Sequence, residues 1–278
     1  MPTIQIVVLA HNEEQRIGAC LASLPAGAQD IVIAAIVNGS TDHTARIVRQ
    51  FPEVTLYEYP QGGKSRSWNR FMLDTPGILA DYYIFVDGDS ELAPGSIEAL
   101  VRTLDENPQA NAASGLPLNG RKAQAYRKAI AHTHGLFGDL YALRGDFVDR
   151  MRAKNIRLPE DLVGDDGLIG ALAKTDLQDE SQWQDDRVVP CEKAGFYCEP
   201  VRISRSSLTM QYRRMVNYSL RHFQNRIVTD IMRSTGPAGL PLRLAPLYPN
   251  YLLRFRPRVH PEWWWFDRQA LRRMADAA

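Results

Sequence analysis

The sequence predicts an α/β fold with a mainly parallel central sheet and helices on both of its faces. Over the first 105 residues, short apolar runs rich in β-branched residues alternate with segments of helical spacing, and this alternation is typical of parallel sheets. The chain has 278 residues, of which 45% are hydrophobic, so it can bury a substantial core. This composition excludes collagen-like, coiled-coil and wholly disordered chains.

Four apolar runs in the first half are expected to form buried strands. They cover residues 4–10, 31–37, 54–58 and 82–86. Helical spacing predicts helices over 13–24, 44–50, 65–73 and 94–104. Asn12 is the expected N-cap of the first helix, because an Asn side chain can accept a hydrogen bond from a free backbone N–H group.

The pattern is less regular beyond residue 115. Helices are expected over 123–137, 161–174 and 208–232, a short apolar stretch over 140–143, and short strands over 188–203. Residues 234–262, rich in Pro and Leu, are expected to be irregular, and Trp263 to open a last short helix that ends near residue 275.

Polar clusters follow three of the predicted strands. They are residues 12–14, residues 38–42 and Asp87-Gly88-Asp89. The carboxyl ends of parallel strands share one edge of a sheet, and ligands bind there. We therefore expect the three clusters to line one crevice, with His11 near enough to touch a ligand.

Asp87 and Asp89 are candidate metal ligands. Two carboxylates one residue apart on a turn can hold a hard cation that keeps positions open for phosphate oxygens, and Gly88 allows a ligand to approach the backbone. Asp and Gly are also common in solvated turns. The position of the motif, after a buried strand and in the shared crevice, favours the metal site.

Residues 62–65 (Gly-Gly-Lys-Ser) are similar to the end of a phosphate-binding P-loop. Glu58 stands where that pattern needs Gly, and the chain has no GxGxxG, so nucleoside-triphosphatase and dinucleotide-binding folds lack support. Lys64 and Arg66 are either partners for a diphosphate or part of a solvated helix end. Asp165-Asp166 is a metal pair, a catalytic base or a charge pair at a helix N-terminus.

The three cysteines, Cys20, Cys191 and Cys198, are scattered, which favours buried free thiols in a reducing compartment. No apolar run approaches the ~20 residues of a membrane helix. The first ten residues lack a basic leader and a cleavage site. These observations predict a cytoplasmic protein.

Charge is distributed unevenly along the chain. Residues 1–200 carry 19 Lys and Arg and 28 Asp and Glu, whereas residues 201–278 carry 14 Arg, no Lys and 4 Asp and Glu. Two interpretations remain open for this segment. Residues 235–278 could lie on the anionic inner face of the membrane as a peripheral contact, or the segment could pack on the acidic body with its Arg residues paired to acids. Nucleic acid is not an expected partner, because the body is acidic.

In combination, these motifs resemble the family 2 glycosyltransferases of the GT-A fold. The similarity runs in order over residues 4–105 and continues more faintly to residue 215. It rests on residues 7–14 (VVLAHNEE), residues 38–42 (NGSTD), Gly63-Lys64 with Asn69, and residues 85–89 (FVDGD).

The resemblance implies an inverting transferase that uses a nucleotide sugar and Mn²⁺ or Mg²⁺. It implies a catalytic domain over 1–210, with a nucleotide-binding half (1–115) and an acceptor half (116–210), and an Arg- and Trp-rich helical extension over 211–278. The implied nucleotide-sugar site consists of Ala10, His11, Glu13, Asn38, Lys64, Arg66 and Asp87. The implied metal ligands are Asp87 and Asp89.

The resemblance also assigns the catalytic and acceptor side. Asp165-Asp166 falls where the family has Glu-Asp, so Asp166 is the implied general base. Gln211 and Arg214 match the Gln-x-x-Arg-Trp element on the acceptor and diphosphate side, although Met215 replaces its Trp. Val37 and Asn38 replace residues that are often Asp, so a UDP-sugar is expected but the base is not fixed. Phe71 replaces a usual Gly.

The expected reaction moves the sugar to a hydroxyl of a saccharide or lipid-linked acceptor, in the synthesis of a cell-surface glycan. Two other functions remain open. One is a non-catalytic adaptor that binds nucleotide sugars. The other is a nucleotidyltransferase of similar fold, which would release pyrophosphate rather than a nucleoside diphosphate.

Overall fold

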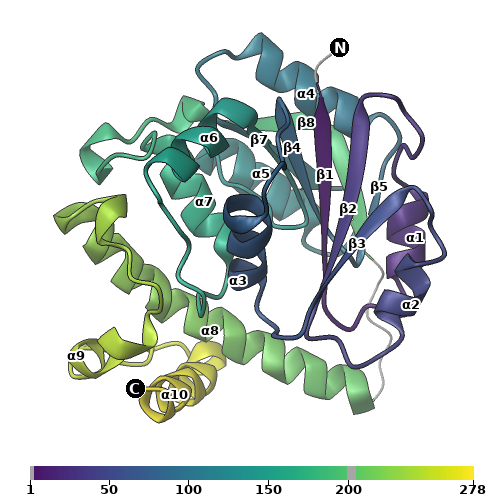
Figure 1. Cartoon of the computed structure of the whole chain (residues 1–278). Helices are drawn as coiled ribbons and strands as arrows, with labels where there is room; N and C mark the ends of the chain where they lie inside the picture. The colour runs from purple at the N-terminus through teal and green to yellow at the C-terminus, as the bar shows by residue number, and fades with distance from the viewer. Residues whose placement is uncertain (1–2, 199–204) are drawn as a thin grey trace.

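A single curved sheet of eight strands forms the centre of the computed structural model, which describes residues 3–198 and 205–278 (Figure 1). The sheet order is β3-β2-β1-β4-β7-β6-β8-β5. The strands are β1 (Ile4–Ala10), β2 (Ile31–Asn38), β3 (Val54–Tyr59), β4 (Tyr82–Asp87), β5 (Ser90–Leu92), β6 (Ala112–Pro117), β7 (Leu140–Arg144) and β8 (Val188–Cys198). The last residues of the strands expected over 188–203 lie outside the described part of the chain.

The first half of the sheet is parallel, as expected. β1 pairs in parallel with both β2 and β4, and β3 extends this half beside β2. β7 runs antiparallel to β4 and to β6, which makes the complete sheet mixed. The carboxyl ends of β1, β2, β3 and β4 therefore meet at one edge.

Helices cover both faces of the sheet, and each face has its own core. Side chains alternate between the faces along each strand, so Val7 and Leu9 enter one core while Ile6 and Val8 enter the other. The α-helices of the described residues are α1 (Ile17–Ala22), α2 (Thr44–Val48), α3 (Lys64–Asn69), α4 (Ser96–Glu106), α5 (Ala123–Thr133), α6 (Gly145–Ala153), α7 (Asp165–Lys174), α8 (Arg205–Ser234), α9 (Tyr248–Leu252) and α10 (Pro261–Asp276). Arg70–Asp74 continues α3 as a π-helix.

Asn12 is not the N-cap of the first helix, so this expectation was wrong. Helix α1 begins at Ile17, and its N-cap is Arg16. Asn12 instead adopts a left-handed conformation with φ 57°, and its Oδ1 accepts a 2.8 Å hydrogen bond from the backbone N–H of Thr41. The Asn12 side chain thus ties the loop after β1 to the loop after β2.

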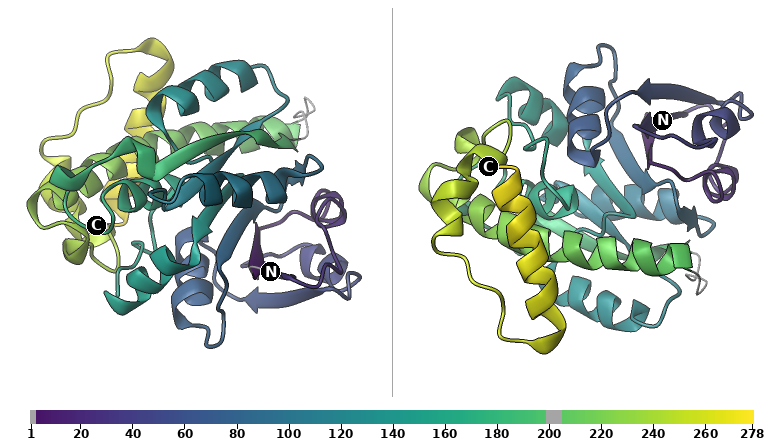
Figure 2. Two further views of the ribbon diagram at one scale, coloured as in Figure 1. Left: turned by 90° about the horizontal axis from the view of Figure 1, so that it is seen from above. Right: turned by 90° about the horizontal axis from the view of Figure 1, so that it is seen from below.

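The C-terminal extension packs on the body. Helix α8 crosses below the carboxyl ends of the parallel strands, and α10 crosses α8 (Figures 1 and 2). Phe223 and Ile227 of α8, Tyr248 of α9 and Met274 of α10 are buried in the core on one face of the sheet. The expected boundary between residues 210 and 211 falls inside α8.

Among the described residues, most of the Arg side chains in the extension are not paired with acids of the body. Arg221 pairs with Asp166 and Arg233 with Glu180, while Arg258 pairs with Asp267 inside the extension. These are the ion pairs that the described Arg side chains of the extension form. None of the described helices is long and apolar enough to span a membrane.

Candidate active site

The polar clusters that follow the parallel strands line one cleft of about 560 Å³. The walls include Ala10 at the end of β1, Asn38 at the end of β2 and Asp87 at the end of β4. Glu13, Asp89 and the glycine loop of residues 62–63 before α3 also line the cleft. The crevice expected from the sequence is thus confirmed. Gly88 is needed where it stands, because a Cβ at this position would lie 2.8 Å from Ala10 Cβ.

Asn38 joins the ends of β1 and β2 to the glycine loop, residues 62–63, in this cleft. Its Nδ2 donates to the carbonyl of Ala10 at 3.2 Å, and its Oδ1 accepts from Gly63 N–H at 3.2 Å. The Asn38 carbonyl in turn accepts from Nδ1 of His11 at 2.6 Å. Both amide atoms of Asn38 therefore have partners within the protein, and the cleft wall is organised by the side chain expected to read the base.

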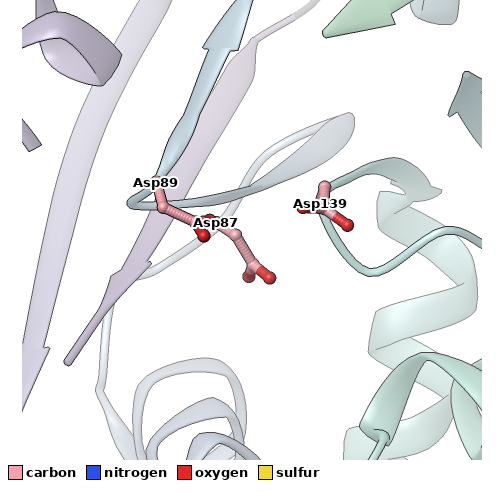
Figure 3. Close-up of side chains that lie close together, drawn as sticks. All are labelled: Asp87, Asp89 and Asp139. Atoms are coloured by element: carbon pink, nitrogen blue, oxygen red, sulfur yellow. The ribbon is translucent and has the colours of Figure 1, made fainter. Parts of the chain in front are cut away.

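Three carboxylates lie close together beside the cleft (Figure 3). One oxygen of Asp87, one of Asp89 and one of Asp139 all lie within 4.8 Å of one another. Asp87 and Asp89 come from the end of β4, whereas Asp139 comes from the loop before β7. The backbone N–H of Asp87 donates to the Asp139 carbonyl at 3.2 Å, which fixes the two loops together.

Asp139 was not found by sequence reasoning. It is a single acid after Phe137-Gly138, and no spacing links it to Asp87. The only available signal was its position directly before an apolar stretch that forms β7. The antiparallel pairing of β7 with β4 brings Asp139 to the carboxyl end of β4.

Asp87, Asp89 and Asp139, which we call the acidic cluster, suit a divalent cation. Burial, together with the nearby acids, raises the pKa of Asp87 well above its ordinary value, and burial and the charge of Asp89 raise the pKa of Asp139. Crowded carboxylates that resist ionisation would be stabilised by a cation between them. Hard oxygen ligands are also the donors that Mg²⁺ and Mn²⁺ prefer, so these residues fit the ion that the sequence predicts.

Lys64 connects the acidic cluster to α7. Its Nζ lies 2.6 Å from Asp87 Oδ1 and 3.8 Å from Asp165 Oδ1, and it donates to the Gly138 carbonyl at 3.2 Å. Burial alone would lower the pKa of Lys64, but Asp165 and Asp87 outweigh it and raise that pKa well above its ordinary value. Lys64 is thus a firmly held cation in the cleft.

Glu13 and Arg16 form the opposite border of the cluster. Arg16 lies 2.5 Å from Glu13 Oε2 and 3.4 Å from Asp89 Oδ2. Burial and the charge of Asp89 raise the pKa of Glu13 to about 7, although Arg16 acts in the other direction.

The two acids at the start of α7 have different surroundings. Asp165 is 2% exposed and faces Lys64, and burial raises its pKa. Oδ2 of Asp166 accepts a 3.0 Å hydrogen bond from Arg221 of α8, and its Oδ1 accepts none from the described residues. A Cβ on Gly138 would contact both Lys64 Nζ, at 3.4 Å, and Asp166 Cγ, at 3.5 Å, so Asp166 lies close to the cation of the cleft.

Other predicted site residues occupy different positions. The guanidinium of Arg66 donates to Glu160 and to the Gly62 carbonyl, each at 3.0 Å, and Arg66 is not among the residues that line the cleft. Gln211 is half-buried on α8. Arg214 is exposed on α8, and its Nε donates to the Tyr218 hydroxyl at 2.7 Å. Desolvation would lower the pKa of Arg214, but Tyr218 and the charges of Asp139 and Asp89 raise it.

Two cleft residues come from the extension and were not expected. Asn217 of α8 and Arg273 of α10 line the same cleft as the strand-end residues, and Arg273 donates to Asn217 Oδ1 at 2.8 Å. No sequence pattern links them to the motifs of the first half, because only the docking of α8 and α10 brings them there.

The sequence model of glycosyl transferase family 2 matches residues 5–162, which contain the strand-end clusters, Lys64 and the three clustered acids. The chain belongs to glycosyl transferase family 2. As a family 2 member it is a glycosyltransferase with a GT-A type fold. No curated protein matched its sequence.

Solved structures of similar fold include three such enzymes. The mannosyltransferase PcManGT from Pyrobaculum calidifontis, in complex with GDP-Man and Mn²⁺, has a TM-score of 0.62 and 20% identity over 99% of this chain and 74% of its own. TarS from S. aureus, in complex with UDP-GlcNAc, has a TM-score of 0.56 and 16% identity over 99% of this chain and 81% of its own. Glucosyl-3-phosphoglycerate synthase from Mycobacterium tuberculosis, with Mn²⁺, UDP-glucose and phosphoglyceric acid, has a TM-score of 0.52 and 18% identity over 79% of each chain. At these identities the similarity concerns the fold.

Proposed function

We propose that this family 2 member transfers a sugar from a UDP-sugar to a hydroxyl of a saccharide or lipid-linked acceptor, and that it inverts the anomeric configuration. The observation that carries this proposal is the position of Lys64. It lines the cleft and contacts Asp87 of the acidic cluster, and Asp166 lies on the other side of Gly138 from it. Uridine is the base expected from the sequence. TarS and the synthase hold uridine nucleotide sugars, whereas the mannosyltransferase holds GDP-Man.

In this proposal the donor occupies the cleft with its base near Asn38 and its diphosphate near Lys64. Ala10, His11 and Glu13 form the nucleoside wall. As the bond from the anomeric carbon to the diphosphate oxygen breaks, negative charge grows on the diphosphate. A fixed ammonium at Lys64 stabilises that charge without reorganisation, and we propose Arg214, which the sequence assigns to the acceptor and diphosphate side, as a second cation.

Asp166 is the proposed general base. Its Oδ2 is held by Arg221, which leaves Oδ1 to take the proton of the acceptor hydroxyl as that oxygen attacks the anomeric carbon. The attack comes from the face opposite the leaving diphosphate, so a single displacement inverts the carbon. Asp165, buried against Lys64, positions that cation instead.

Asp87, Asp89 and Asp139 are the proposed ligands of Mn²⁺ or Mg²⁺, and structures of the mycobacterial synthase contain either ion. When bound, such an ion supplies Lewis-acid stabilisation of the diphosphate.

Thermal shifts with UDP, GDP, dTDP and CMP, each with and without Mn²⁺, test the donor. A ligand at ~100 times its Kd adds about 2.7 kcal/mol, which is roughly 5–10 °C for a chain of this size. We expect a Mn²⁺-dependent shift with UDP. A shift with another nucleotide would change the donor, and no shift with any nucleotide would overturn the donor assignment.

Product analysis tests the reaction type. Transfer should release a nucleoside diphosphate, and a β-configured product from an α-linked donor would establish inversion. Release of pyrophosphate would instead indicate a nucleotidyltransferase, and tight nucleotide binding without turnover of any donor would favour the adaptor.

We further infer that the enzyme works in the cytoplasm and that its extension touches the inner membrane surface. Leu253 is 78% exposed and Val259 fully exposed, and Trp264 and Trp265 are about half exposed on α10. Arg268 lies over the Trp264 ring, and aromatic and cationic groups together suit an anionic interface.

Vesicles containing phosphatidylserine should sediment the full chain, but much less of the Trp264→Ala/Trp265→Ala variant. The Trp183→Ala variant, changed at an exposed Trp of the body, should behave like the native chain. Equal sedimentation of the native chain and both variants would contradict the proposed membrane contact.

A further inference from the structure

A second hollow of about 620 Å³ lies between α8 and α10 and adjoins the donor cleft. Arg213 and Asn217 of α8 and Arg272 and Arg273 of α10 are among the residues that line it. Asn217 and Arg273 also line the donor cleft, so the two hollows share a wall. We call this hollow the arginine groove.

Helical spacing explains why these side chains share one groove. Arg213 and Asn217 stand four residues apart on α8, and Arg272, Arg273 and Asp276 stand on one side of α10, with spacing that keeps them on one helix face. Ala270 and Met274, on the other side of α10, are buried in the core. The core thus fixes the face that α10 turns towards the groove.

The arginine groove carries excess positive charge. It contains three guanidinium groups and one carboxylate, that of Asp276. Among the described residues, Arg213, Arg272 and Arg273 form no ion pair, and Arg273 makes a hydrogen bond to neutral Asn217. By contrast, Arg221, Arg233 and Arg258 of the same extension are each paired with an acid.

We propose that the arginine groove binds a phosphate or diphosphate group of the acceptor. This inference rests on the proposed function. Guanidinium groups form charge-assisted, often bidentate hydrogen bonds to phosphate oxygens. A bound dianion would also relieve the mutual repulsion of the three Arg side chains.

The position of the groove favours the acceptor over the donor. The donor diphosphate has its own partners at Lys64 and the acidic cluster. Arg213, Asn217 and Arg221 follow one another at four-residue intervals on α8, and Arg221 contacts Asp166. Eight residues of helix span about 12 Å. An acceptor anchored by its phosphate at Arg213 and Arg272 could therefore extend along α8 and present a hydroxyl to Asp166.

Titration of the full-length protein with inorganic phosphate and with pyrophosphate, in EDTA and with Kd as the readout, tests this site. The variant Arg213→Gln/Arg272→Gln removes two charges without touching the donor cleft. The matched control Arg243→Gln/Arg254→Gln removes two exposed charges of the extension away from the groove. We expect at least tenfold weaker binding in the groove variant, since a hydrogen bond to a charged group contributes about 1.5–3 kcal/mol, and native affinity in the control.

Two results would overturn the arginine groove as a phosphate site. One is that the native protein binds neither anion, and the other is that all three proteins bind them equally. Circular dichroism and melting temperature establish that the groove variant is folded.

Binding of UDP with Mn²⁺, measured on the same proteins, separates this inference from the proposed function. We expect UDP affinity to be equal in all three. If none of the three proteins bound UDP, but phosphate binding still depended on Arg213 and Arg272, the donor assignment would be wrong and the phosphate site would remain supported.

Vesicles of phosphatidylcholine with and without phosphatidic acid distinguish the source of the phosphate. Sedimentation that requires phosphatidic acid and is lost in the groove variant would indicate a lipid-borne phosphate. Phosphate binding without such sedimentation would indicate a soluble phosphorylated acceptor.

Discussion

Arg221 of α8 donates a 3.0 Å hydrogen bond to Oδ2 of Asp166, the second residue of α7. This contact joins the C-terminal extension, which the family model does not cover, to the acid proposed as the base. A Cβ on Gly164 would lie 2.4 Å from Arg221 Nε, so the loop before α7 leaves room for the guanidinium only because residue 164 is Gly. The extension therefore contributes directly to the proposed active site.

Asp166→Asn should retain Mn²⁺-dependent UDP binding but lose transfer by a factor of about 10²–10⁴, because general-base catalysis contributes this much. Asp165→Asn should weaken UDP binding as well, since Asp165 helps to hold Lys64. Calorimetry with UDP and a transfer assay check both variants. Normal transfer by the Asp166 variant would move the base elsewhere.

Arg221→Gln should lower turnover about tenfold and leave the Kd for UDP unchanged, because it removes the group that orients Asp166 and no donor contact. Arg233→Gln is the matched control. It breaks another ion pair between α8 and the body, with Glu180, and should leave turnover unchanged. Arg221→Lys keeps the charge and should restore part of the turnover. If it restored none, and Arg221→Gln also weakened UDP binding, Arg221 would act on the donor rather than on the base.

Asp139→Asn should weaken the binding of Mn²⁺ about tenfold or more and should make the UDP-induced thermal shift require higher Mn²⁺ concentrations. The reason is the loss of one of three clustered carboxylates. Titration with Mn²⁺ at constant UDP measures the effect. Asp186→Asn, at an exposed acid of the body, should titrate like the native protein, and identical behaviour of the Asp139 variant would reduce the metal site to Asp87 and Asp89.

The ionisation of Glu13 should lower the free energy of unfolding of the metal-free protein as pH rises. Its pKa is raised from 4.5 to about 7 in the folded chain, so between these values the native state holds a proton that the unfolded state has released. The stabilisation is therefore fully present below pH 4.5 and is lost as pH rises through 7.

Chemical denaturation in EDTA between pH 4.5 and 7.5 measures this loss. Glu13→Gln should remove a pH-dependent change on the order of 2 kcal/mol, whereas Glu53→Gln, at an exposed acid, should not. Parallel stability curves for the native and Glu13→Gln proteins would show that Glu13 does not titrate in this range.

The parallel half of the fold could be predicted from local sequence. The predicted strands over 4–10 and 31–37 agree with β1 and β2 to within a residue, because fully buried parallel strands are continuous apolar runs. Their order then places the polar clusters at one edge. Strand β6, with the sequence AASGLP, was not predicted, because Ala, Gly and Pro have low strand propensity and only pairing with β7 and β8 keeps it extended.

The other side of the site depends on tertiary contacts. Asp139 reaches the acidic cluster only through the antiparallel pairing of β7 with β4, and Arg273 reaches the cleft only because α10 packs on α8. The wrong prediction of Asn12 as an N-cap has a similar cause. Its side chain accepts a hydrogen bond from Thr41, 29 residues away, and not from the following helix.

Helix α8 has 30 residues without a break, so it is about 45 Å long. Asn217 in the cleft wall and Arg221 at Asp166 both belong to this one helix. A tilt of the helix would displace both groups together. A donor that moved α8 on binding in the cleft would therefore also move Arg221, and with it Asp166, where the acceptor reacts.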